Sequence, residues 1–194
     1  MANDDDSQST AESQQPRNHA SHKRPRSKQF LGNDMGIFWH TTPVPANFVL
    51  RLKWLRWHEA ANSGVYVRFP DPDSKNYNNT AFVADDFGFE VQIDEFGNMP
   101  VHRTGAIYRK DNRTDFEALN QVAARPAGEW NDYEIRVEGQ IYTVTMNGQQ
   151  VCVFDNSTAY PARGRDAQTH MGLQVYADAR SLVAYRRIQV AALP

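Results

Sequence analysis

Short runs in which apolar residues stand at every second position constrain the fold of this chain more than any other feature. In the run 48–54, positions 48, 50, 52 and 54 are all large and apolar. The run 132–138 repeats the pattern, with Tyr, Ile and Val at its odd positions. A period of two is typical of a β-strand that buries one face. These two runs therefore predict half-buried strands.

Further strands are expected between turn signals, over residues 65–69, 89–94, 105–108, 141–146, 150–154, 170–176 and 181–190. Turns are expected at 62–64 and 139–140. Asn147-Gly148 is the strongest short hairpin signal. Residues 70–80 and 109–128 are expected to be connections. No helical period extends beyond one turn near 115–121. The pattern predicts an all-β protein, folded as an antiparallel two-sheet sandwich of jelly-roll type.

The apolar residues also divide the chain in two. Residues 1–29 contain no Val, Ile, Leu, Phe, Tyr or Trp, and such a segment has too little to bury for stable folding. We expect residues 1–30 to be a disordered polar tail and residues 31–194 to be one domain. The basic run 23–28 is either an electrostatic tether or, as we favour, a solvated tail.

Composition excludes several classes of protein. The formal net charge of −2 argues against a dedicated nucleic-acid binder, so no nucleic acid is expected as a partner. No apolar run approaches the roughly 20 residues of a membrane-spanning helix, so no membrane is expected as a partner either. The N-terminus lacks the pattern of a secretory signal, and the default expectation for localisation is cytoplasmic. Cys152 is the only cysteine, which excludes an internal disulfide and a Cys-x-x-Cys zinc site.

The run 89–94 contains the most informative candidate residues. In a strand, Glu90, Gln92 and Asp94 project to one face while the apolar residues between them anchor the other. Cα atoms two residues apart on one face are separated by about 6.6 Å. Two carboxyl groups on one surface are what acid–base chemistry on sugars uses. The alternative is a solvated strand face, which often carries acids.

Two other residues strengthen the acid–base reading. With Val65, Val67 and Phe69 on one face of their strand, Arg68 is expected on the opposite face, beside Tyr66. A guanidinium near the acids would lower their pKa values and bind an oxyanion. Tyr108 offers a hydroxyl or a stacking ring. The alternatives are a surface salt bridge for Arg68 and a core position for Tyr108.

Six motifs in fixed order resemble the 3-keto-disaccharide hydrolase domain, loosely called a family 16-like glycoside hydrolase. They are NSGVYVR at 62–68, FEVQID at 89–94, TGAIY at 104–108, GEWNDY at 128–133, MNG at 146–148 and GLQV at 172–175. The resemblance covers about residues 35–190. It implies a concanavalin-like jelly roll that acts on glycosides, especially sugars oxidised at C3.

The resemblance also implies roles for particular residues. Glu90 or Asp94 would be a catalytic base or a metal ligand, and Arg68 would stabilise the developing oxyanion. Gln92, Tyr108 and Gln174 would bind sugar hydroxyls. Family members commonly carry a His where this chain has Tyr176, which would line the pocket. The cofactor is unknown, although a divalent metal such as Ca²⁺ or Mn²⁺ is compatible with such a site.

The sequence thus predicts a carbohydrate-processing domain. We favour a hydrolase that cleaves a 3-keto-glycoside or 3-keto-disaccharide by abstracting the proton next to the ketone. The alternative is a non-catalytic carbohydrate-binding module of the same fold. A third class is a structural or interaction domain tethered through the basic tail. The oligomeric state is left open.

Overall fold

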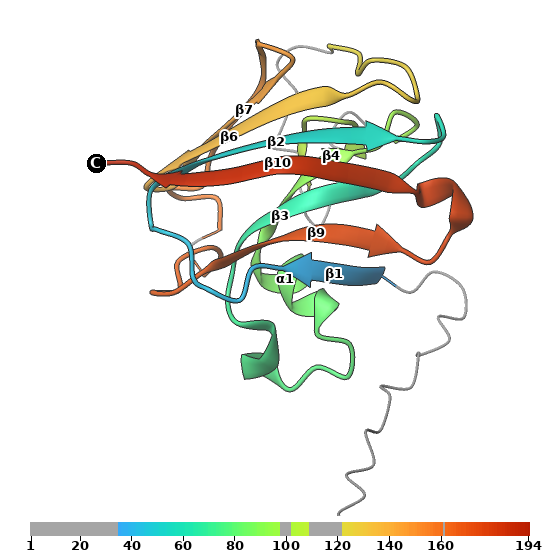
Figure 1. Cartoon of the computed structure of the whole chain (residues 1–194). Helices are drawn as coiled ribbons and strands as arrows, with labels where there is room; N and C mark the ends of the chain where they lie inside the picture. Colours follow the sequence, from blue (N-terminus) through green and yellow to red (C-terminus); the bar gives the residue numbers. More distant parts are fainter. Residues whose placement is uncertain (1–34, 98–101, 109–121, 161) are drawn as a thin grey trace, which may run out of the picture.

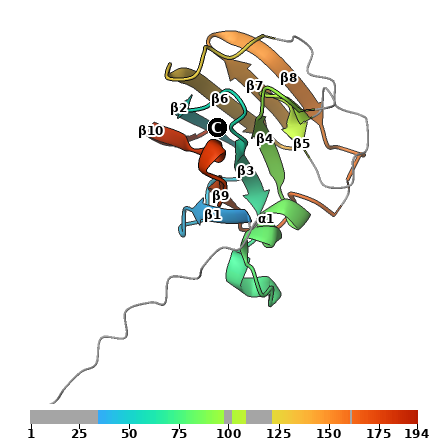
Figure 2. The ribbon, with the colours of Figure 1, turned by 90° about the vertical axis from the view of Figure 1, so that its right-hand side faces the viewer.

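The computed structural model describes residues 35–97, 102–108, 122–160 and 162–194. Two antiparallel sheets of five strands each face one another, which confirms the predicted two-sheet sandwich (Figure 1). Figure 2 shows the same two layers from another side. The first sheet has the order β1-β9-β3-β4-β5 and the second has the order β10-β2-β6-β7-β8. The strands are β1 (Met35–Trp39), β2 (Phe48–Arg56), β3 (Ser63–Phe69), β4 (Phe89–Ile93), β5 (Ile107–Tyr108), β6 (Asn131–Glu138), β7 (Ile141–Met146), β8 (Gln149–Asp155), β9 (His170–Tyr176) and β10 (Val183–Ala192).

The main core lies between the two sheets and is built from the alternating apolar positions. Leu50, Leu52 and Trp54 of β2 are at most 2% exposed, as are Val91 and Ile93 of β4. The residues between the apolar positions of β4 therefore project from the outer face of the first sheet. The interior packing of β4 thus fixes which way its acids point.

The structure confirms one predicted turn and contradicts another. Asn147-Gly148 joins β7 to β8 as expected. The turn expected at 62–64 is wrong, because Ser63 and Gly64 pair with Ile93 and Gln92 inside the first sheet. The chain turns earlier instead, where the Ala61 N–H donates to the His58 carbonyl at 3.1 Å.

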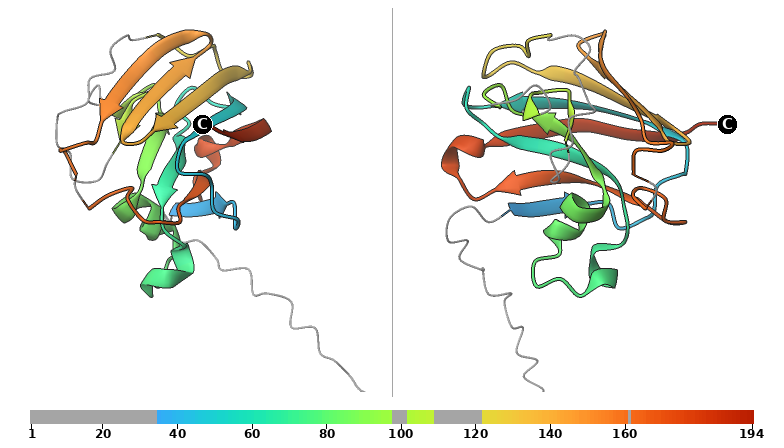
Figure 3. Two further views of the ribbon diagram at one scale, coloured as in Figure 1. Left: turned by 90° about the vertical axis from the view of Figure 1, so that its left-hand side faces the viewer. Right: turned by 180° about the vertical axis from the view of Figure 1, so that it is seen from behind.

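A short helix that the sequence pattern did not predict covers part of the first sheet. Helix α1 (Ala81–Phe87) contacts β1, β3 and β4 and follows a 3₁₀ turn, η1 (Pro72–Lys75) (Figure 3). Its Ala81 and Ala84 join Tyr66 and Phe69 in a second, smaller apolar cluster on the outer face of the sheet. Two turns of helix are too short to show a clear 3.6-residue period.

The register of β3 changes at Arg68. Arg68 has a φ of 61°, and the pairing of β3 with β9 shifts between Val67 and Phe69. This bulge ends the alternation, so Phe69 packs with Tyr66 rather than with Val65 and Val67. The prediction that Phe69 shares a face with the two valines is therefore wrong.

Several expectations fall outside the described residues. These are the tail at 1–30, the first part of the connection at 109–128 and the helical turn near 115–121.

The 3₁₀ turn η3 (Ala179–Ser181) leads into β10, which starts two residues later than expected. Within the described ranges, no helix is long and apolar enough to cross a membrane.

Candidate active site

The outer face of β4 forms the floor of a pocket of about 330 Å³ beside the small apolar cluster. Five residues expected at a sugar site line this pocket: Glu90, Gln92, Asp94, Tyr108 and Tyr176. The pocket is completed by Asn62, Phe96, Gly97 and His102. The row of side chains along β4 therefore faces a cavity large enough for a sugar ring.

Glu90 is the deepest acid of the pocket. It pairs across the sheet with Tyr66 on β3 and Tyr108 on β5, and only 1% of its surface is exposed. Neither of its carboxylate oxygens has a hydrogen-bond partner within 3.5 Å, although the Tyr66 hydroxyl lies near enough to lower the pKa of the carboxyl group. Its side chain lies over Gly64, where an added Cβ would be 2.0 Å from Oε1. The missing side chain at Gly64 thus provides the space that the carboxylate occupies.

The surroundings of Glu90 raise its pKa well above the ordinary value of 4.5. Burial is the largest cause, because removal from water disfavours the charged form. The carboxylate of Asp85 on α1 adds to the rise, and Asp94 contributes less. The nearby Tyr66 hydroxyl offsets part of it. A carboxylate with a raised pKa is a stronger base than an ordinary one.

A chain of hydrogen bonds holds Tyr66 beside Glu90. The Gln174 side-chain amide donates to the Tyr66 hydroxyl oxygen at 3.1 Å, and that hydroxyl donates to Asp85 at 3.4 Å. Burial, with a further contribution from Glu90, raises the pKa of Tyr66 well above 10.0. Tyr66 therefore keeps its proton. Gln174, which is 3% exposed, acts on the site through Tyr66.

Asp94 stands at the opposite end of the pocket from the small apolar cluster. Its carboxylate accepts hydrogen bonds from the Asn62 side chain at 3.3 Å and from the Phe96 backbone N–H at 2.9 Å. Half-burial raises the pKa of Asp94, and the backbone N–H groups of Phe96 and Gly97 counteract this. The His102 ring lies 5.2 Å from the Tyr108 ring in an edge-to-face arrangement. The pocket thus contains two acids, an imidazole and two tyrosines.

Arg68 does not join these residues, and the prediction that it lies beside Tyr66 on the acid face is wrong. The bulge in β3 reverses its side chain, whose guanidinium donates to the backbone carbonyls of Ala46, Gly139 and Gly164. The distances to Gly164 and Gly139 are 3.3 and 2.9 Å. Arg68 therefore ties three connecting segments together and does not stabilise an oxyanion at this pocket.

The residues at the pocket do not form a recognisable metal site. In the part of the chain that the structure describes, no three His, Cys, Asp or Glu side chains are grouped so that they could bind one ion. A Ca²⁺ site typically uses six to eight oxygen ligands, several of them carboxylates. Among the described lining residues only Glu90 and Asp94 are carboxylates, so this donor set does not fit the divalent ion that the family resemblance allowed.

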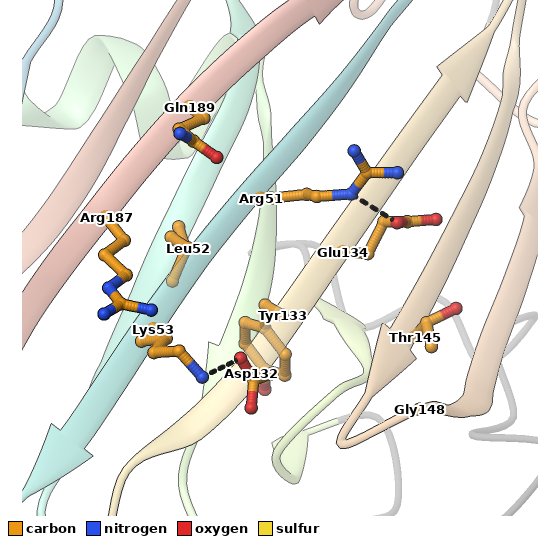
Figure 4. A pocket seen from close by; sticks show the side chains of 10 residues that line it. All are labelled: Arg51, Leu52, Lys53, Asp132, Tyr133, Glu134, Thr145, Gly148, Arg187 and Gln189. Atoms are coloured by element: carbon orange, nitrogen blue, oxygen red, sulfur yellow. Dashed lines mark hydrogen bonds and ion pairs between the residues drawn. The ribbon is translucent and has the colours of Figure 1, made fainter.

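A second pocket, of about 350 Å³, lies on the outer face of the other sheet (Figure 4). Its charged residues form surface ion pairs, Arg51 with Glu134 at 2.7 Å and Lys53 with Asp132. Arg187, in a bulge of β10 with a φ of 52°, extends over the same groove. Its acids are exposed and paired, so they are poor candidates for general acid–base chemistry. The pocket on β4 is the candidate active site.

Sequence reasoning did not assign Asn62, Asp85 or His102 to the site. Asp85 lies on the unexpected helix. The signal for Tyr66 was present in the alternation of β3, because it shares the face of Gly64. Knowledge of the strand pairing would have placed it beside Glu90.

The fold and the pocket define a jelly-roll domain with a polar cavity on the outer face of one sheet. The chain belongs to the family of 3-keto-alpha-glucoside-1,2-lyase-like domains, whose sequence profile matches residues 13–191. This confirms the resemblance drawn from the six motifs. No curated protein sequence matches the chain closely enough to count as a relative.

Several solved structures share this fold. A candidate glycosyl hydrolase from Parabacteroides distasonis matches with a TM-score of 0.59 and 22% identity, over 82% of this chain and 84% of that one. Another from the same organism matches with a TM-score of 0.60 and 15% identity, over 81% and 74%. The carbohydrate-binding module CBM66 from Bacillus subtilis has a TM-score of 0.51 and 8% identity, over 84% of both chains. At these identities the likeness shows the fold alone.

Proposed function

We propose that this protein cleaves a glycosidic bond in a 3-keto-glycoside, with Glu90 as the general base. The observation that carries the proposal is the burial of Glu90 at the pocket floor, with both carboxylate oxygens unpartnered. A buried, unpaired carboxylate costs stability and is typical of functional sites. Membership in a family of 3-keto-glucoside lyase-like domains supports the choice of substrate.

The chemistry follows from the ketone. A carbonyl at C3 acidifies the hydrogen on C2, so a carboxylate can remove that hydrogen as a proton. The electron pair left on C2 is delocalised onto the C3 oxygen as an enolate. The enolate then expels the anomeric substituent from C1, forming a C1–C2 double bond. The leaving oxygen takes up a proton. Water then adds its oxygen to C1 while a proton returns to C2, which restores the 3-keto-sugar and completes hydrolysis.

The remaining pocket residues fit binding and proton transfer. The side-chain Oε1 atom of Gln92 accepts a hydrogen bond from the backbone N–H of Ile93 at 3.3 Å, which leaves the side-chain NH₂ group of Gln92 to donate to the substrate. Tyr108 pairs with Glu90 across the sheet, so its side chain lies on the same face as the base and lines the pocket with it. Asp94 and His102, at the end of the pocket nearer the loop, are suited to proton transfer at the leaving oxygen.

Release of sugar from a 3-keto-disaccharide tests the proposal. The wild-type protein should release it, and Glu90→Gln should reduce the rate by at least about 100-fold, since general-base catalysis contributes roughly 10²–10⁴-fold. Glu134→Gln is a matched control, because Glu134 is an ion-paired acid on the other sheet. No release by the wild-type protein, or equal loss in both variants, would refute the proposal.

Non-catalytic sugar binding is the second candidate. Two observations favour it: Arg68 lies away from the acids, and Tyr176 stands where family members commonly carry a His. Under this alternative, sugars should raise the melting temperature by mass action without being cleaved.

A further inference from the structure

We propose that the pocket on β4 discriminates its ligand by charge: it accepts neutral and cationic sugars and excludes anionic ones such as uronates. The inference rests on the proposed function only in taking the ligand to be a sugar. It concerns recognition, which can be measured without any cleavage.

The pocket contains buried hydrogen-bond acceptors that have no donor. The lining residues Glu90 and Asn62 carry three buried oxygen atoms that lack a partner, both carboxylate oxygens and the Asn62 Oδ1. The orientation of the Asn62 amide is fixed, because its Nδ2 donates to Asp94 at 3.3 Å. Buried acceptors without donors are costly, so a ligand gains affinity by bringing donors to them. Hydroxyl and ammonium groups bring such donors, whereas a carboxylate brings only acceptors.

The charged groups around the pocket also favour neutral and cationic ligands over anionic ones. Glu90 and Asp94 project from β4, and Asp85 of α1 lies behind Tyr66. Tyr176 of β9 is uncharged, because burial and the nearby acids raise its pKa above its ordinary value. Among the described residues no lysine or arginine lines the pocket, and His102 is its single basic group.

The arginines on neighbouring segments make other contacts. Arg103 donates through its Nε to the Gly97 carbonyl at 3.2 Å, and its side chain is not among those that line the pocket. Arg68 donates to backbone carbonyls, and Arg56, which is 3% exposed, pairs with Glu59 at 2.6 Å. A uronate would meet the Asp94 carboxylate and, above the raised pKa of Glu90, a second carboxylate, and like charges are strongly unfavourable when water is excluded.

The outer groove of the second sheet offers the opposite chemistry and serves as an internal control. Arg51, Lys53 and Arg187 line it, and no ion-pair partner for Arg187 is found in the described ranges. Any binding of an anionic sugar is expected there. Substitution of Arg187 would then affect that binding and leave the pocket on β4 unchanged.

A matched series of ligands tests the proposal. Methyl α-glucoside, its 2-amino-2-deoxy derivative and methyl α-glucuronide share one ring and differ in charge, and the ammonium group of the amino sugar stands on C2, the carbon that the proposed function places beside Glu90. Binding at pH 7 is followed by NMR titration of the full chain, and shifts of residues along β4 locate the site. We expect the amino sugar to bind about five- to tenfold more tightly than the neutral sugar, because charge-assisted hydrogen bonds are roughly twice as strong. The glucuronide should bind at least about tenfold more weakly than the neutral sugar.

Two variants complete the test. Glu90→Gln should remove most of the preference for the amino sugar, and Arg187→Gln should leave that preference intact. Equal affinities for the three sugars at β4, tighter binding of the glucuronide there, or no binding of any of them would overturn the proposal. Failure of the enzymatic proposal looks different, since a protein that binds with this charge preference but releases no sugar fails only as an enzyme.

Discussion

Replacement of Gly64 by alanine tests whether the space above β3 is reserved for Glu90. An added Cβ would lie 2.0 Å from the Glu90 Oε1 atom and 2.6 Å from its Cδ and Cγ atoms. Ordinary contacts of a Cβ are 3.4–4 Å, so the Glu90 side chain must leave its position or β3 must move. The clash involves a side chain that is 1% exposed and cannot simply swing into water.

The expected cost is that of overpacking a filled interior, about 1–3 kcal/mol in the free energy of unfolding. Without the clash, replacement of a glycine by alanine is neutral or stabilises by about 0.4–1 kcal/mol, because it restricts the unfolded chain. We therefore expect Gly64→Ala to destabilise the wild-type protein by about 1–3 kcal/mol. In the Glu90→Ala background the same substitution should have no cost.

Urea denaturation of the wild-type protein, both single variants and the double variant measures this coupling as a double-mutant cycle. Gly36→Ala on β1 is a matched control, since its added Cβ would lie at an ordinary 3.7 Å from the nearest atom. If Gly64→Ala costs the same with and without Glu90, the carboxylate does not occupy that space and the reasoning fails.

Three further predictions follow from the buried polar groups. Burial raises the pKa of Glu90, so the folded protein binds the proton of the Glu90 carboxyl group more tightly than the unfolded chain does. The contribution of this proton to the free energy of unfolding is complete below pH 4.5, the ordinary pKa of the group. The unfolding free energy of the wild-type protein relative to Glu90→Gln should therefore fall as the pH rises from 4.5 through the folded-state pKa; a flat or rising difference in urea titrations at several pH values would contradict this. Arg68→Met should lower the unfolding free energy by about 3 kcal/mol, because three carbonyls lose a charged donor, while the pH dependence of activity stays unchanged; a shifted pH profile would return Arg68 to the active site. Burial raises the pKa of the Cys152 thiol to about 11, so iodoacetamide at pH 8 should label it only after unfolding, as mass spectrometry can show.

The strands could be predicted because a sheet with one buried face enforces a period of two. The row of Glu90, Gln92 and Asp94 followed directly from that period, since Val91 and Ile93 had to face the core. The bulge at Arg68 could not be predicted, because one inserted residue reverses every later assignment and leaves no mark in the alternation. Strand β3 therefore appears regular in the sequence, although its pairing with β9 shifts between Val67 and Phe69 in the structure.

The burial of Glu90 was also beyond the reach of the sequence. It depends on residues distant along the chain: the bare backbone of Gly64, the Tyr66 ring opposite and the α1 helix that covers the adjoining part of the sheet. Asp85 enters the electrostatics of the site only because that helix forms. Alternation predicts which face a residue occupies, but the depth of that face is set by what packs over it.

The position of Arg68 bears on how the proposed reaction is balanced electrostatically. The sequence assigned a guanidinium to the developing enolate, but none is found among the described residues that line the pocket. When Glu90 takes the proton from C2, its own negative charge disappears as the charge on the substrate oxygen appears. The total charge in the pocket therefore does not change during this step, and no new cation is required. Once Glu90 carries the proton, it no longer repels negative charge on the substrate, and this favours formation of the enolate. Neutral donors such as Tyr108 and the Gln92 amide then need only direct the charge toward the C3 oxygen.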